Sequence, residues 1–97
     1  MRQGRSDIVD QLLQLFLDST PELLEELHAA VDNADAAELK RAAHKLKGSC
    51  QNVGASFMAT LASALERGDA TAGAVDELEA AYEPTRDALI DALGGTG

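Results

Sequence analysis

Apolar residues recur along most of the chain at the three- and four-residue spacing of amphipathic helices. Short polar or glycine-containing stretches divide this pattern into five segments, in which alanine, leucine and glutamate dominate and β-branched residues are few. The predicted helices cover approximately residues 7–18, 20–31, 35–53, 55–67 and 74–93. We therefore expect an all-α fold. The last four helices should form an antiparallel four-helix bundle, with the first as an additional N-terminal helix packed across one end.

Residues with strong preferences for helix ends set these boundaries. Thr20 and Pro21 suit an N-cap and the first helical position, so they predict that a new helix starts after the first segment. Asp35 and Glu38 have the spacing of a capping box at the start of the third segment. Gly54 is expected to end that helix in a left-handed conformation. The short connection then makes the third and fourth segments an antiparallel hairpin.

Other signals concern the last segment and the ends of the chain. Pro84 lies inside the last predicted helix, where it removes one backbone hydrogen bond, so we expect a kink or a break there. Residues 69–73 are expected to form a loop. We interpret residues 1–97 as a single domain with flexible ends at 1–5 and 94–97.

The segment 39–55 carries the candidate chemistry. On a helix with about 100° per residue, its apolar side chains form one continuous stripe, and His44 lies roughly 140° from the direction of the first of them. The stripe consists of Leu39, Ala42, Ala43, Leu46, Cys50 and Val53. His44 is therefore expected to face solvent. Its neighbours on the helix surface are Lys40, Arg41, Lys47, Gly48 and Gln51.

An exposed imidazole with these neighbours suits phosphoryl acceptance. Neutral imidazole is a nucleophile, and an unperturbed histidine is largely neutral near pH 7. Lys47 can bring its ammonium group towards an anion attached to His44. Gly48 costs about 1 kcal/mol relative to alanine in a helix and leaves a bare stretch of backbone that another protein could approach. The alternative interpretation is a surface histidine beside ordinary solvated lysines.

Two stretches of this segment, 43–49 and 52–55, have the sequences AHKLKGS and NVGA. Together they resemble the signature of the histidine-containing phosphotransfer (HPt) domain, a module of multistep two-component phosphorelays and of chemotaxis-type kinases. Chain length and helix order also fit this family. The resemblance implies a phosphocarrier in signal transduction rather than an enzyme.

Residue by residue, the resemblance implies that His44 is the phosphoacceptor, that Lys47 stabilises the phosphate and that Gly48 lets a partner dock. Family members often carry a glutamate or glutamine that hydrogen-bonds to the ring, and the matching position here is Glu66. Counting from the turn at Gly54 also brings His44 and Glu66 to a similar height, although Glu66 could be an ordinary surface residue. The candidate docking residues are Lys40, Arg41, Lys45, Gly48 and Gln51.

The charge distribution agrees with a protein partner. The net charge is −9, which argues against binding to nucleic acid or to an anionic membrane surface. Four of the eight lysines and arginines nevertheless lie between positions 40 and 47, and residues 39–65 contain no aspartate or glutamate. An acidic body with one neutral-to-basic helix hairpin suits docking onto an acidic protein surface.

Composition narrows the remaining possibilities. No apolar run is long enough for a membrane span, and we expect a cytoplasmic monomer without a signal peptide. Cys50, the single cysteine, excludes an internal disulfide and should pack as a small hydrophobe. No metal site is expected, because the ligand count for zinc is too low, and His28 is interpreted as a solvated surface residue.

The function that we predict is phosphoryl relay through His44. It would take the phosphoryl group from the aspartyl phosphate of one response-regulator receiver domain and pass it to another receiver aspartate. By the resemblance, the receiver would supply Mg²⁺, this chain would need no cofactor, and a hybrid sensor histidine kinase is a possible partner. Two alternatives stay open: direct phosphorylation from the ATP site of a chemotaxis-type kinase, and a helical docking module that is not phosphorylated.

Overall fold

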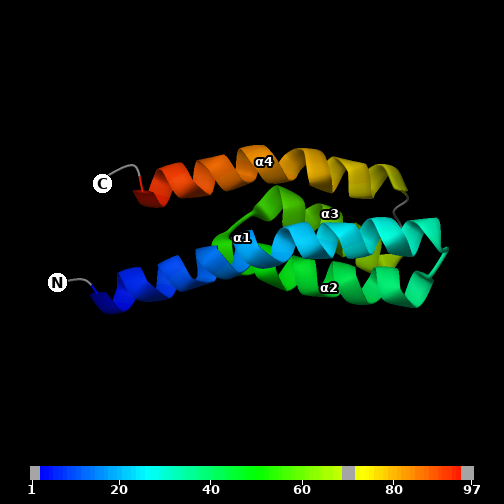
Figure 1. Cartoon of the computed structure of the whole chain (residues 1–97), viewed down its shortest axis with the longest axis horizontal. Helices are drawn as coiled ribbons and strands as arrows, with labels where there is room; N and C mark the ends of the chain where they lie inside the picture. Colours follow the sequence, from blue (N-terminus) through cyan, green and yellow to red (C-terminus); the bar gives the residue numbers. More distant parts are fainter. Residues whose placement is uncertain (1–2, 69–71, 95–97) are drawn as a thin grey trace.

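The computed structural model describes residues 3–68 and 72–94, and every regular element in them is a helix. In chain order the helices are α1 (Gln3–Asp32), α2 (Ala36–Val53), α3 (Ser56–Arg67) and α4 (Ala72–Gly94) (Figure 1). The predicted all-α fold is confirmed. α2 and α3 form an antiparallel hairpin that packs against the longer helices α1 and α4, and the core lies between them.

The predicted N-terminal helix across one end is wrong. The first two predicted helices are one continuous helix, α1, and the described residues contain four helices instead of five. Thr20 is not an N-cap but a fully buried residue inside α1. Pro21 has no N–H to donate to the carbonyl of Leu17, four residues earlier. The hydroxyl of Tyr82, on α4, donates to that carbonyl at 3.4 Å instead. A tertiary contact thus replaces the hydrogen bond that the proline removes, and the helix continues.

Pro84 does not break α4 either, so the expected break is absent. The proline leaves the carbonyl of Ala80 without its usual partner, but both residues are exposed and water can hydrate that group. α4 begins at Ala72, two residues before the predicted start, and α1 begins at Gln3, inside the stretch predicted to be flexible. The rest of the predicted loop at 69–71, and the ends at 1–2 and 95–97, lie outside the described residues.

The predicted N-cap and C-cap of α2 are present, but only half of the predicted capping box forms. The side chain of Glu38 accepts from Arg41, and the backbone N–H of Asp35 donates to the carbonyl of Ala30. The side chain of Asp35 accepts a hydrogen bond of 3.1 Å from the backbone N–H of Glu38 at the start of α2. Gly54 ends α2 with φ 76°, in the left-handed region that glycine adopts without strain. Because the turn that follows is so short, α3 returns directly alongside α2. This return is what brings residues of the two helices together at the site described below.

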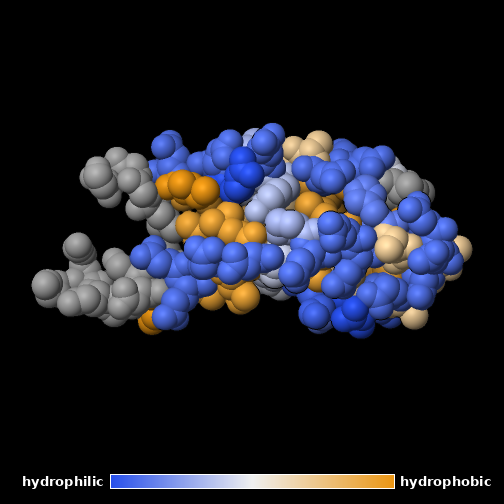
Figure 2. All heavy atoms as spheres, viewed as in Figure 1, coloured by the Kyte–Doolittle hydropathy of each residue, from blue (hydrophilic) through white to orange (hydrophobic). Residues whose placement is uncertain are grey.

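The hairpin covers only part of the long helices. The molecule measures 49 × 21 × 18 Å, and α1 and α4 project beyond the α2–α3 turn at the end where both termini lie (Figure 1). Apolar side chains show between these projecting parts (Figure 2). Among the residues whose exposure the structure describes, the exposed large apolar side chains are those of Ile8, Leu15, Phe57 and Ile90. No helix in the described part of the chain combines the length and the apolar character needed to cross a membrane.

Candidate functional site

His44 lies near the middle of α2 and points out of the bundle. The stripe predicted from the sequence faces the core: Ala42, Ala43, Leu46 and Cys50 are all fully buried. Since these residues fix the rotation of α2, His44 is turned to the opposite side, and its side chain is 66% exposed. The packing of the helix therefore presents the ring to solvent.

One nitrogen of this ring is held by α3. Nδ1 of His44 lies 2.6 Å from Oε2 of Glu66, near the C-terminal end of α3. A carboxylate only accepts hydrogen bonds, so in the neutral imidazole Nδ1 carries the proton and Nε2 carries the free lone pair. Within the described residues no hydrogen bond is formed to Nε2. Glu66 thus selects the tautomer of His44 in which the free lone pair of the ring is on Nε2.

Lys47 binds the same carboxylate from the other side. Its Nζ lies 2.6 Å from Oε1 of Glu66, so Glu66 bridges Lys47 and His44. The pKa of Glu66 is held below its usual value. The largest cause is the hydrogen bond from Lys47, and the second is the hydrogen bond from His44. The carboxylate is therefore ionised at neutral pH. The ion pair between Lys47 and Glu66 was not foreseen in the sequence analysis, which assigned Lys47 only to the phosphate.

Gly48 has no internal packing role. It lies one turn after His44, and apart from its chain neighbours and the backbone of its own helix, a Cβ added to it would meet no atom of the described residues within 4 Å. A glycine inside a helix costs about 1 kcal/mol relative to alanine. Since nothing inside the molecule requires a missing side chain here, the open space next to the imidazole is a feature of the surface.

The remaining predicted docking residues do not form one group. Lys40, Lys45 and Gln51 are exposed on α2. Arg41 instead turns towards α1: it donates to Glu38 through Nε at 3.0 Å and forms an ion pair with Glu26 of α1 at 3.4 Å. The four cations that cluster in the sequence are thus divided. Lys47 reaches the His44 site, whereas Arg41 joins α2 to α1.

A polar groove adjoins the site on its α3 side. It has a volume of about 310 Å³ and is lined by Lys47, Gln51, Ala59, Thr60, Ser63 and Arg67. Two of these residues, Lys47 and Gln51, were predicted from the sequence, whereas the contribution of α3 was not. Only the hairpin geometry indicates that contribution, because the α3 residues belong to no motif.

Cys50 takes no part in this chemistry. It is fully buried, and burial raises the pKa of its thiol to about 11. The thiolate is the reactive form of cysteine, so this residue is inert at neutral pH. It packs as the small hydrophobe that the sequence predicts.

Comparison with known proteins identifies the family. The family model described as the Hpt domain matches residues 11–93, which include all of α2 and α3. No curated protein and no solved structure gives a significant match to the chain. Domains of this family are phosphocarriers of phosphorelays that interact with receiver domains, and they are not catalytic enzymes.

Proposed function

Because the chain belongs to the Hpt domain family, we propose that His44 is its phosphoacceptor, taking the phosphoryl group from a receiver aspartyl phosphate and passing it to a second receiver aspartate. One observation carries this proposal. Glu66 binds Nδ1 of His44 at 2.6 Å and leaves Nε2 free on a largely exposed ring. That is the arrangement that a histidine nucleophile requires.

In the proposed step the lone pair of Nε2 attacks phosphorus in line with the bond to the aspartate. An N–P bond forms as the P–O bond breaks, and the receiver aspartate leaves as a carboxylate. Nδ1 keeps its proton, so the ring gains positive charge as the N–P bond forms. The ionised carboxylate of Glu66 lies against that proton and stabilises this charge. The reverse sequence delivers the phosphoryl group to the next aspartate.

Lys47 has two possible partners in this reaction. In the free protein its ammonium group binds Glu66. A phosphoryl group on His44 adds about −1.5 to −2 charge close by. We propose that Lys47 then shifts part of its hydrogen bonding to the phosphoryl oxygens while it stays near Glu66. It would offset charge in both states without any movement of the helices.

The docking surface that we propose is centred on Gly48. The missing side chain would allow a receiver helix or loop to come close to Nε2, and Lys40, Lys45 and Gln51 surround it with polar and cationic groups. Arg41 belongs to the edge of this surface because it is bound to glutamates of its own chain. Mg²⁺ would come with the receiver, as an ion held beside its phosphorylated aspartate.

A transfer assay tests this function. A receiver domain phosphorylated by a small-molecule donor is mixed with the wild type or with His44→Gln. Label that is stable in base and labile in acid should appear on the wild type alone. A second arm with a chemotaxis-type kinase and ATP separates the two routes of phosphorylation. If neither donor labels the folded wild type, the helical docking module becomes the better interpretation.

A further inference from the structure

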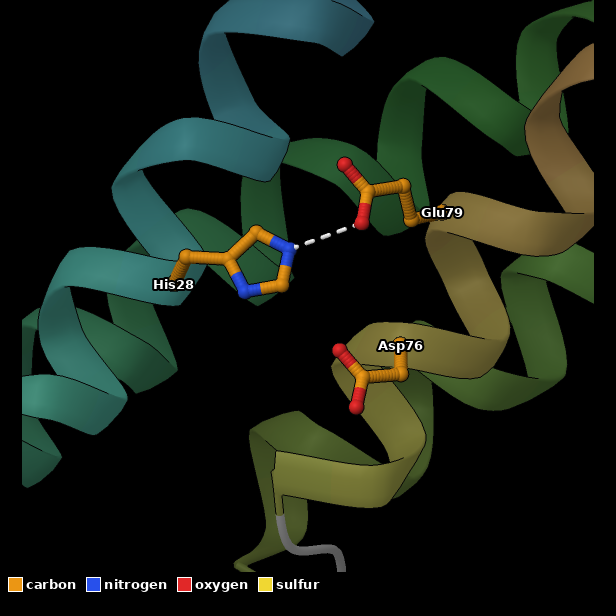
Figure 3. A group of neighbouring side chains, drawn as sticks. All are labelled: His28, Asp76 and Glu79. Carbon is orange, nitrogen blue, oxygen red and sulfur yellow. Dashed lines mark hydrogen bonds and ion pairs between the residues drawn. The ribbon is translucent and has the colours of Figure 1, made fainter.

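A second group of chemically active side chains lies away from His44, between α1 and α4. His28 comes from the C-terminal part of α1, and Asp76 and Glu79 come from the N-terminal part of α4 (Figure 3). The spacing of three residues puts the two carboxylates on the same face of α4. Both point towards the ring of His28 (Figure 3).

From the sequence, His28 was interpreted as a solvated surface histidine. Its contacts in the structure differ from that interpretation. Nε2 of His28 lies 3.1 Å from Oε1 of Glu79, and the side chain of His28 is 39% exposed. One ligand atom from each of the three residues lies within 4.8 Å of the other two. Within the described residues no lysine or arginine forms an ion pair with Asp76 or Glu79. One imidazole therefore faces two carboxylates that form no ion pair with a lysine or arginine in the part of the chain that the structure describes.

This donor set suits a particular class of cation. An imidazole nitrogen with carboxylate oxygens is typical of sites for zinc and similar divalent transition metals, whereas Mg²⁺ and Ca²⁺ prefer oxygen ligands alone. Ligand atoms at about 2.1 Å from a tetrahedral Zn²⁺ are roughly 3.4 Å apart. The three ligand atoms here must approach by about 1.5 Å or less, which a rotamer change of exposed carboxylates provides. Water would complete the coordination.

We propose that His28, Asp76 and Glu79 form a binding site for a divalent transition-metal ion of the zinc class. The ion would join α1 to α4 at the end of the bundle opposite the two termini (Figure 1). The site shares no residue with the His44 site on α2 and α3. Metal binding and phosphoryl transfer can therefore be tested separately.

Calorimetric titration with Zn²⁺ at pH 7.5 tests the proposal. The wild type should bind one equivalent, and His28→Gln, Asp76→Asn and Glu79→Gln should each weaken that binding by about tenfold or more. Zn²⁺ at a hundred times its Kd should also raise the Tm of the wild type by about 10–20 °C. Circular dichroism shows whether each variant keeps the helical fold.

Two controls make the result specific. Glu77→Gln removes a neighbouring acidic charge of α4 that is outside the group, and it should leave the Kd within about threefold. His44→Gln removes the other histidine and should bind Zn²⁺ as the wild type does. The proposal is overturned if the wild type shows no saturable binding below about 1 mM Zn²⁺, or if His44→Gln loses the binding and His28→Gln keeps it. In NMR spectra of the wild type, Zn²⁺ should shift the ring nitrogens of His28 and leave those of His44 unchanged.

Discussion

The carboxylate of Glu66, on α3, lies 2.6 Å from Nδ1 of His44, on α2, and so leaves the lone pair on Nε2 of a side chain that is 66% exposed. The two residues are 22 positions apart, and the short turn at Gly54 brings them together. The chemistry that we propose for this chain depends on this contact, because it determines which nitrogen is nucleophilic and where the charge of the phosphorylated ring is stabilised.

Removing the carboxylate of Glu66 should slow phosphoryl transfer. Glu66→Ala loses both the hydrogen bond to Nδ1 and the negative charge, so we expect the single-turnover rate from a phosphorylated receiver to fall by about 10- to 100-fold. Glu66→Gln keeps a hydrogen-bond acceptor without the charge and should show an intermediate rate. Equal rates for the wild type and Glu66→Ala would contradict the proposed role.

Lys47 should control the ionisation of Glu66. Lys47 is the largest cause of the lowered pKa of Glu66, so Lys47→Ala should raise that pKa towards the ordinary value of about 4.3. A glutamate with a lowered folded pKa stabilises the fold above its unfolded pKa, and the contribution is lost as the pH falls through the lowered folded value. The Lys47→Ala variant should therefore lose less stability on acidification below about pH 4.3.

Carbon NMR titration of the Glu66 carboxyl measures this pKa directly. Lys40→Ala is the matched control, because it removes an exposed lysine of α2 that has no contact with Glu66. An unchanged Glu66 titration in Lys47→Ala would show that the ion pair seen in the structure has no effect in solution.

Substitutions of Gly48 should separate its effect on stability from its effect on phosphoryl transfer. A Cβ at this position meets nothing, so Gly48→Ala should stabilise the protein by about 1 kcal/mol and raise the Tm by roughly 4–8 °C. Gly48→Gln fills the space beside His44 and should slow transfer from a receiver by about tenfold or more. Thermal unfolding and transfer kinetics measure the two effects.

The control for Gly48 is Ala29→Gln, which adds the same side chain at an exposed position of α1. It should leave the transfer rate unchanged. If Gly48→Gln transfers as fast as the wild type, the open surface beside His44 is not where the receiver docks.

The hydrogen bond from Tyr82 to α1 should contribute more to the free energy of unfolding when Pro21 is present than when it is replaced. Tyr82→Phe removes the donor to the carbonyl of Leu17 and should cost about 0.5–1 kcal/mol. Pro21→Ala restores a backbone donor for that carbonyl, so Tyr82→Phe should cost less in this background. Urea unfolding of the four proteins of this cycle gives the coupling energy, and strict additivity would contradict the compensation that we describe.

Local signals in the sequence predicted the central hairpin well. The apolar stripe of α2, the cap at Asp35 and the glycine at position 54 are all decided within a few residues, and the structure has them. The position of Glu66 near His44 also follows from counting residues on both sides of a short turn. These features depend on helix geometry alone.

The features that the sequence analysis missed depend on contacts between distant helices. The local sequence at Thr20 and Pro21 does not show whether a helix starts there or continues through them. The compensation for the proline comes from Tyr82, 65 positions beyond Leu17. The pairing of His28 with Glu79 spans 51 positions and depends on how α4 lies against α1. A helix pattern does not determine this register.

The most direct test of the proposed function is the position of the phosphoryl group on the ring of His44. The ¹⁵N-labelled protein is phosphorylated by a receiver and studied by NMR that correlates ring protons with both ring nitrogens and with phosphorus. Our account predicts an N–P bond at Nε2 of His44, with the proton kept on Nδ1 beside Glu66. Phosphorylation at Nδ1, at another residue or at none would contradict it.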